Sequence, residues 1–321
     1  MDHVKELGTA IKDGIKNGIK ISAIALIIIL LYSIFLLIVP LVFDALYSDA
    51  ITNETISFIK SNSSGESFPI ALLKWERNYF ISPYSENKIP ETGSLDAWVR
   101  GFGFVKINGT YHLFIRSAPM SWKIKYRLAN CGEYAQVFTY LMNKSGYHTR
   151  LVTAPAEDHM WAEYYEGNEK IVVETSGGYI INNTKTFATG RNWSYIVSLD
   201  IFNTSDSIDV SDEYIDRENL SVKIKDNGQN ARDVQITVLS PFLMQADPSR
   251  YNIPNPVVSN STDEYGLARF KLGPKNYILQ LKKNYFLFSY ICSKNISVIT
   301  NHENYVDIDI NKEKCEWKFL N

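Results

Sequence analysis

The sequence predicts an α+β protein in which one transmembrane helix precedes a mixed core and an all-β sandwich follows it. Residues 21–43 carry no charge, a capped helix beginning at Cys131 leads into three short strands, and alternating apolar patterns recur beyond residue 219. We divide the chain into a cytoplasmic tail, a transmembrane helix, a tether, the mixed core, a linker and the sandwich, at residues 1–20, 21–43, 44–64, 65–204, 205–218 and 219–321.

The uncharged segment at residues 21–43 is dominated by Ile and Leu. At about 1.5 Å of rise per residue, a helix of this length spans a hydrocarbon core of about 30 Å. Lysines precede the segment and Asp44 follows it, so the positive-inside rule predicts a cytoplasmic N-terminus and an extracytoplasmic remainder. A cleaved signal peptide with a site at Ser48-Asp49-Ala50 is the alternative, although its apolar region is usually about 7–15 residues long. We therefore expect a single-pass protein of the cell membrane.

The composition narrows the classes of function. The chain has 33 basic and 35 acidic residues, so it predicts no surface for nucleic acid. It has no HExxH motif, no paired CxxC motif and no P-loop, and we expect neither a metal nor a cofactor. Asn-x-Ser/Thr triplets fit a glycoprotein of the cell surface. Examples are Asn53, Asn62, Asn108, Asn143, Asn192, Asn219, Asn260 and Asn295.

The chain has three cysteines, an odd number for an extracytoplasmic protein. Cys292 and Cys315 lie in one β-rich stretch and could join two strands through a disulfide. Cys131 is then the remaining thiol, and a thiol in an oxidising compartment calls for a reason. A buried structural cysteine is the alternative to a reactive one.

The mixed core is expected around the helix that begins at Cys131. Asn130 is a good N-cap residue, Glu133 stands at the capping-box position, and Gly146 ends the helix. An acidic, serine-containing stretch beyond the core is interpreted as the linker. Short strands are predicted at residues 150–154, 161–165 and 170–175.

The C-terminal region alternates between apolar and polar residues, as strands do. Asp226-Asn227-Gly228 is a hairpin signal, and the apolar residues of segment 268–272 alternate with basic ones. The run Thr-Asp-x-x-Gly-x-Ala-x-Phe at residues 262–270 and the Pro-x-x-Tyr at residues 274–277 resemble carboxypeptidase-regulatory-like or prealbumin-like modules. This resemblance implies an all-β sandwich of about 100 residues and is nearly silent on function.

Cys131, His159 and Glu174 have the residue types that activate a thiol nucleophile. A thiol in the first turn of a helix is favoured as thiolate, although Glu133 works against this. A histidine can take the thiol proton and later protonate the leaving amine, while a carboxylate orients its ring. We expect the Cys131 N–H to donate to the oxyanion. Asp158 is an alternative orienting residue, although neighbouring strand side chains point to opposite faces.

These segments resemble the transglutaminase-like superfamily. The likeness rests on Cys131 opening a helix, on His159-x-Trp161 in a strand, and on Glu174 in the next strand. Gly-Tyr-His-Thr-Arg-Leu-Val at residues 146–152 is similar to the family's Gly-x-x-Ala-Arg-x-Val strand. The resemblance implies a papain-like core with Cys131, His159 and Glu174 as its catalytic residues. The chain departs from the family pattern at Glu174, because the usual residue there is Asp.

The resemblance implies a thiol enzyme that acts on amide bonds through an acyl-enzyme on Cys131, and the apolar segment adds a membrane anchor and a site outside the cytoplasm. It would be a cysteine protease, an amidase or a transglutaminase-type acyltransferase acting on a peptide or a cell-envelope polymer. We favour hydrolysis over crosslinking because water is abundant outside and no amine-binding pocket can be read from the sequence. The alternative, kept open by Glu174, is a catalytically inactive transglutaminase-like module for surface binding or adhesion.

Overall fold

The computed structural model describes residues 2–81, 101–107, 109–202, 206–248, 251–285 and 288–319. The expected α+β class is confirmed, because helices alternate with several antiparallel sheets. The chain forms two compact units, and helices α2 and α5 contribute residues to both. The first unit comprises residues 1–71 and 78–133, and the second comprises residues 72–77 and 134–321.

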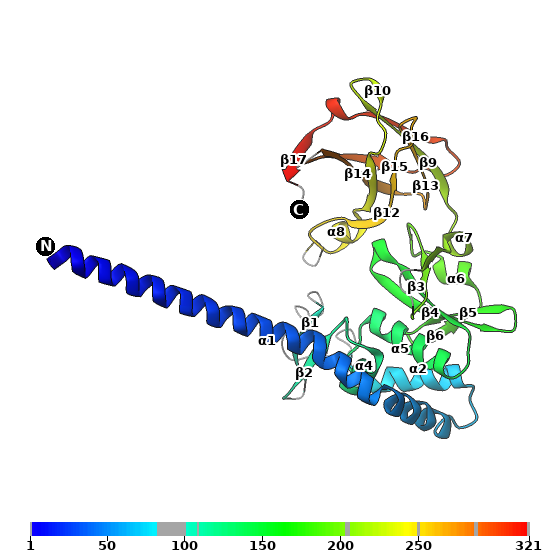
Figure 1. The fold of residues 1–321 in the computed structure, drawn as a ribbon. Coiled ribbons are helices and arrows are strands. Elements are labelled where there is room, and N and C mark those ends of the chain that lie inside the picture. The colour runs from blue at the N-terminus through cyan, green and yellow to red at the C-terminus, as the bar shows by residue number, and fades with distance from the viewer. Residues whose placement is uncertain are drawn as a thin grey trace. The chain divides into compact units, whose positions relative to one another are not determined.

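Helix α1 runs without a break over Asp2–Ser61, with Pro40 inside it (Figure 1). The portion from Gly18 onward is long and apolar enough to cross a membrane. The helix also covers most of residues 44–64, which were expected to form a tether. Ile56 and Ile59 are buried in that part, so it packs as a regular helix of the first unit. The polar composition of residues 44–64 gave no indication in the sequence that these two positions are buried.

Of the other described elements that contribute to the first unit, α4 packs against the end of the apolar run. Trp122 lies edge-on to Phe43 with 5.5 Å between the ring centroids, and Ser121 Oγ donates a hydrogen bond to Asp44 Oδ1 at 2.6 Å. These contacts fix the helix α4 against α1 at the point where the apolar run gives way to acidic residues. The elements are α2 at Phe68–Tyr79, β1 at Phe102–Ile107, β2 at Thr110–Ile115 and α4 at Met120–Tyr126.

The second unit contains a six-stranded antiparallel sheet in the order β6-β5-β4-β3-β7-β8, which follows helix α5 at Cys131–Lys144. The apolar stripe of α5 is fully buried at Val137, Phe138 and Leu141. Trp161 and Trp193 belong to a second buried cluster that covers the sheet beside α6 and α7. The elements are β3 at Thr149–Ala154, η1 at Pro155–Glu157, β4 at His159–Glu166, β5 at Glu169–Glu174, β6 at Tyr179–Ile181, α6 at Thr184–Ala188, β7 at Val197–Leu199, β8 at Ser207–Asp209 and α7 at Ser211–Tyr214.

The C-terminal region is β-rich, as predicted, and forms two sheets that share one apolar core. In one sheet β9 pairs with β10, β13 and β16, and the other has the order β12-β11-β14-β15-β17. The elements are β9 at Glu218–Asp226, β10 at Gln229–Asn230, β11 at Gln235–Ser240, α8 at Phe242–Ala246, β12 at Asn255–Ser261, β13 at Leu267–Leu272, β14 at Asn276–Tyr285, β15 at Phe288–Ser297, β16 at Asn304–Asp309, η2 at Ile310–Lys312 and β17 at Cys315–Phe319.

Several details of the sandwich match the sequence expectation. Asn227 and Gly228 form the two-residue turn between β9 and β10, both with positive φ, which this hairpin turn requires. Ala268, Phe270 and Leu272 are buried, as the alternating pattern predicted. Cys292 and Cys315 stand directly opposite each other on β15 and β17 and are joined by a disulfide.

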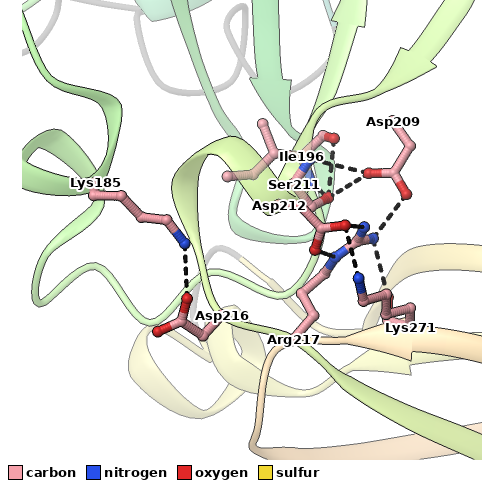
Figure 2. Close-up of polar contacts among 8 residues, drawn as sticks. All are labelled: Lys185, Ile196, Asp209, Ser211, Asp212, Asp216, Arg217 and Lys271. Atoms are coloured by element: carbon pink, nitrogen blue, oxygen red, sulfur yellow. Dashed lines mark hydrogen bonds and ion pairs between the residues drawn. The ribbon is translucent and has the colours of Figure 1, made fainter.

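The segment at residues 205–218 is ordered in its described part, in contrast to the expected linker. It forms β8, the edge strand beside β7, and then α7. Arg217 donates to Asp209 at 2.7 Å and to Asp212 at 3.0 Å, and Lys271 of β13 donates to Asp212 at 2.7 Å (Figure 2). The acidic residues were interpreted as a solvated linker, but one of their basic partners, Lys271, lies more than fifty positions further along the chain.

The buried carboxyl group of Glu76 gives a prediction for stability. Neither carboxyl oxygen has a hydrogen-bond partner among the described residues, and burial raises the pKa of Glu76 well above its ordinary value of 4.5. A raised folded-state pKa means that stability is present at low pH and is lost as the pH rises above the unfolded-state pKa.

Glu76→Gln should therefore leave stability at pH 4 almost unchanged and raise it by roughly 1–3 kcal/mol at pH 7. Chemical denaturation of the full chain at both pH values measures the difference. Glu66→Gln, a change at an exposed glutamate, is the control and should show no such dependence. Equal effects of Glu76→Gln at both pH values would contradict the prediction.

Candidate active site

Cys131 is the first residue of α5, and its surroundings follow from the capping of that helix. The Asn130 N–H donates to Glu133 Oε2 at 3.0 Å, which is the contact that a capping box predicts. Asn130 Oδ1 accepts the Cys131 N–H at 2.8 Å. Cys131 is partly exposed and takes no part in a disulfide. The N–H that we expected to bind an oxyanion is thus already engaged, so an oxyanion there must displace the Asn130 side chain.

The negative charge of Glu133, which opposes a thiolate at Cys131, is balanced by two basic residues. Arg116 Nε lies 3.4 Å from Glu133 Oε1. Burial lowers the pKa of Lys123 to about 8. The negative charge of Glu133 opposes this lowering, and the positive charge of Arg116 adds to it. The first turn of α5 therefore carries an acidic residue whose field is largely compensated within the first unit.

His159 and Glu174 are in direct contact in the second unit. His159 is the first residue of β4 and Glu174 is the last of β5, and these two strands pair antiparallel. The distance from His159 Nε2 to Glu174 Oε2 is 2.7 Å. The Glu174 side chain is 4% exposed and that of His159 is 21% exposed. Glu174 thus orients the imidazole through Nε2, which leaves Nδ1 as the nitrogen that can exchange a proton.

The Glu174 carboxylate has two further partners. Ser176 Oγ donates to Oε1 at 2.8 Å, and Arg191 Nη2 lies 3.4 Å from Oε2. Burial by itself would raise the pKa of Glu174, but its contacts with His159, Ser176 and Arg191 outweigh burial and hold that pKa below its ordinary value. Glu174 is therefore ionised at neutral pH, which is the state that stabilises an imidazolium.

Arg191 is fixed beside the pair by aromatic rings. Its guanidinium lies 4.3 Å from the Phe187 ring centroid and 5.3 Å from that of Trp193, within the range of cation–π attraction. Arg191 Nη2 also donates to the Tyr179 hydroxyl at 2.6 Å. The Arg191 Nη1 atom lies 3.5 Å from His159 Nε2. The guanidinium therefore contacts both members of the pair from a position that packing determines.

The turn after β5 holds the backbone beside Glu174. The Gly178 N–H donates to the Glu174 carbonyl at 2.7 Å, and Gly178 has φ +78. A Cβ at Gly177 would lie 2.7 Å from Glu174 Cγ, so a side chain there would displace the carboxylate. Arg77 of α2 donates to the Ser176 carbonyl. Glycine at these positions is thus a requirement of the site geometry.

The imidazole of His159 lies against two stacked tryptophans. Trp161 and Trp193 stack with 4.6 Å between centroids and an interplanar angle of 5°, and the His159 ring lies 5.7 Å from Trp161. Trp161 is fully buried, so it packs in the core. Asp158 accepts from Tyr251 at 2.6 Å, so of the two carboxylates considered, Glu174 is the one that bonds His159.

The structure thus brings together two of the three predicted residues, and Cys131 belongs to the first unit. Sequence reasoning missed Arg191, Ser176 and Arg77. The only usable signal was the Gly177-Gly178 pair after the third segment, which marks a tight turn. Across the described part of the chain, no three His, Cys, Asp or Glu residues lie close enough to hold a metal ion.

Comparison with known proteins places this region in context. Residues 86–180 match the sequence model of the transglutaminase-like superfamily, and this range contains Cys131, His159 and Glu174. A peptide-N(4)-(N-acetyl-beta-glucosaminyl)asparagine amidase from Yarrowia lipolytica (strain CLIB 122 / E 150) is 29% identical over 133 residues, which cover 40% of this chain. The chain spans 36% of the length of that relative. The chain therefore contains a transglutaminase-like core, while the β-sandwich lies beyond residues 86–180, which match the superfamily model.

The lowered pKa of Glu174 gives a prediction with a defined sign. A depressed folded-state pKa contributes stability that is present above the unfolded-state value and is lost as the pH falls through the folded-state value. We expect Glu174→Gln to lower the free energy of unfolding by roughly 1–3 kcal/mol at pH 7 and by less at pH 3.

Denaturant unfolding at pH 7 and pH 3 measures this loss. Glu169→Gln, at the exposed first residue of the same strand, is the matched control and should have little effect at either pH. A loss from Glu174→Gln that is equally large at pH 3 would show that the carboxylate charge is not what stabilises the pair.

Proposed function

We propose that the protein is a thiol amidase in which Cys131 attacks an amide carbonyl, His159 transfers protons and Glu174 orients His159. The observation that carries this proposal is the 2.7 Å contact between His159 Nε2 and buried Glu174, inside the segment matched to the transglutaminase-like superfamily. A surface histidine has no need of a buried carboxylate that two further donors, Ser176 and Arg191, also hold. A general base that must become positively charged does need one.

The proposed reaction begins with proton transfer from the Cys131 thiol to His159 Nδ1. The thiolate sulfur then bonds to the carbonyl carbon, and the C–N bond breaks as the imidazolium returns its proton to the leaving amine. Water next attacks the thioester carbonyl while His159 takes its proton, the C–S bond breaks, and the imidazolium returns the proton to sulfur. The products are an amine and a carboxylic acid and the thiol is regenerated, so no external oxidant or reductant is needed.

Charge stabilisation differs between the two halves of the site. Around His159, the negative charge of the ionised Glu174 stabilises the imidazolium. The positive charge of Arg191, 3.5 Å from His159 Nε2, partly opposes this stabilisation. Around Cys131, the amides at the start of α5 favour the thiolate, while Arg116 offsets the charge of Glu133. The tetrahedral oxyanion would use the Cys131 N–H by displacing Asn130 Oδ1, or would use another N–H of this first turn.

The proposed substrate class is a peptide amide, with a side-chain amide of asparagine as a specific candidate. The name of the Yarrowia relative describes an amidase for glycosylated asparagine in peptides, and this supports hydrolysis over crosslinking. A glycopeptide and the same peptide without its sugar are therefore the two substrates to compare.

The activated thiol is tested by the rate of iodoacetamide alkylation of Cys131 as a function of pH. We expect this rate at pH 6–7 to exceed that of an unactivated thiol by roughly tenfold or more, because an ordinary thiol pKa is about 8.5. His159→Ala and Glu174→Gln should each reduce it, and Cys131→Ala should abolish labelling of the folded chain.

Hydrolysis of the two peptides by the same variants tests catalysis directly. Loss of hydrolysis in Cys131→Ala and His159→Ala is the expected result. If Cys131 reacts no faster than a free thiol and neither peptide is cleaved, the alternative of a non-catalytic surface-binding module is favoured instead.

We also propose that α1 anchors the enzyme as a single-pass protein, with the N-terminus in the cytoplasm and the other residues outside. Support comes from the length and apolar character of its Gly18–Ser61 portion and from the lysines that precede the apolar run. The proposed substrates are then extracytoplasmic peptides or cell-envelope polymers.

Replacing Leu30 and Leu31 by Arg should move the protein from the carbonate-resistant membrane fraction to the soluble fraction, since each Arg costs roughly 2.5–3.5 kcal/mol at a helix centre. Phe58→Arg, on the same helix beyond the apolar run, is the control and should remain in membranes. An N-terminal tag should be reached by protease only after permeabilisation. Cleavage of the mature chain near residue 50 would contradict anchoring.

A further inference from the structure

Two loops that border the His159–Glu174 pair are held by the β-sandwich. One is the η1 loop, residues 155–158, which leads directly into His159. The other is the segment 190–194, which carries Arg191 and Trp193. Both belong to the same compact unit as the sandwich. Every contact described below lies within that unit.

The η1 loop is packed into the sandwich core. Ala156 is fully buried and is a member of the apolar cluster that the two sandwich sheets share. Asn255 Nδ2 of β12 donates to the Ala156 carbonyl at 3.4 Å. A loop that precedes the catalytic histidine thus contributes a side chain to the core of another domain. Removing that core would leave the loop without its main support.

A buried ion pair joins the two loops through one residue of the sandwich. Lys275 Nζ lies 2.6 Å from Glu157 Oε1 and 2.8 Å from the Asn192 carbonyl. Ser194 Oγ also donates to Glu157 Oε1, at 2.5 Å. The Lys275 and Glu157 side chains are only 9% and 4% exposed. Lys275 therefore connects the loop before His159 to the loop of Arg191.

Backbone contacts keep the second loop at a fixed distance from the sandwich. The Gly273 N–H donates to the Ser194 carbonyl at 3.0 Å. A Cβ at Gly273 would lie 2.4 Å from the Trp193 carbonyl oxygen, so no other residue fits without displacing that loop. Trp193 in turn stacks with Trp161 and lies against His159.

A third contact reaches the residue next to His159. Tyr251, in the loop before β12, donates its hydroxyl to Asp158 Oδ2 at 2.6 Å. Asp158 adopts φ +48, in the left-handed region that is unfavourable for most side chains. Neighbouring contacts must hold such a conformation, and here one of them comes from the sandwich.

We propose that the β-sandwich positions the catalytic histidine, with Lys275 and Tyr251 as the positioning residues. The sandwich is then a required part of the active site. This inference rests on the function proposed above. A buried ion pair adds little to net stability, but it defines one arrangement of the groups that it joins, which is the property that a positioning role needs.

The test compares the full-length protein with the double variant Lys275→Met/Glu157→Gln, which removes both charges together and so avoids an uncompensated buried charge. Tyr251→Phe is a second variant that removes a single hydroxyl. Lys271→Met is the matched control, since Lys271 bonds Asp212 outside the two loops (Figure 2).

The first measurement is the NMR signal of the His159 ring proton on Nε2, with histidine labelled in the full chain. Glu174 and Arg191 are the charged groups that contact this ring, and Asp158 precedes it. We expect this proton to exchange with water roughly tenfold faster or more in the double variant, because a loosened Glu174 contact no longer protects it. Tyr251→Phe should also speed the exchange, and Lys271→Met should leave it unchanged.

The second measurement is the pH profile of Cys131 alkylation in the same variants. A fall of roughly tenfold or more at neutral pH is expected for the double variant. Unchanged exchange of the His159 ring proton in a folded double variant would overturn the positioning role. If the exchange is faster in the double variant while Cys131 in the unaltered protein is unreactive, the positioning role stands and the proposed thiol chemistry fails.

Discussion

The contact between His159 and Glu174 is the constraint on which the second unit depends. It requires the start of β4 and the end of β5 to lie side by side in the sheet. It also requires a buried carboxylate to remain ionised, so the surrounding residues supply the hydrogen bonds and charges that replace the lost contact with water. Ser176, Arg191 and the two-glycine turn each act on the position or the charge of Glu174. The longer side chain of Glu, where an Asp is usual, is accommodated because its head group is held from several sides. The departure from the family pattern therefore does not by itself indicate an inactive protein.

The local parts of this arrangement could be predicted from the sequence, because they follow from short-range rules. The cap at Asn130, the strand predicted at residues 161–165, which lies within β4, and the turn at Asn227-Gly228 each depend on residues within a few positions. The alternating burial of β13 and β14 follows from the two-residue period of a strand. The pairing of Glu174 with His159 needed one further step, the antiparallel pairing of consecutive strands.

Contacts between distant parts of the chain were not predictable by such rules. Lys275 bonds Glu157 across more than a hundred residues of sequence, and nothing in the sequence around Lys275 distinguishes it from the other lysines of the chain. Arg191 follows a glycine in a segment without a regular pattern. The same limit explains the linker at residues 205–218, since its acidic residues look solvated until Arg217 and Lys271 are placed beside them. The hydrogen bond from the Cys131 N–H to Asn130 was likewise not predictable from the sequence, because the side chain of an Asn cap can accept from any of several amides.

The unbroken course of α1 has a consequence for where the protein can act. Residues 44–61 continue as helix beyond the apolar run, and at 1.5 Å per residue they extend over about 27 Å. Ile56 and Ile59 of this stretch are buried, so it is part of the first unit and no flexible chain separates that unit from the apolar run. With the anchoring proposed above, the first unit would be held at a nearly constant height above the bilayer. Substrate choice would then depend on the position of an amide bond as well as on its chemistry.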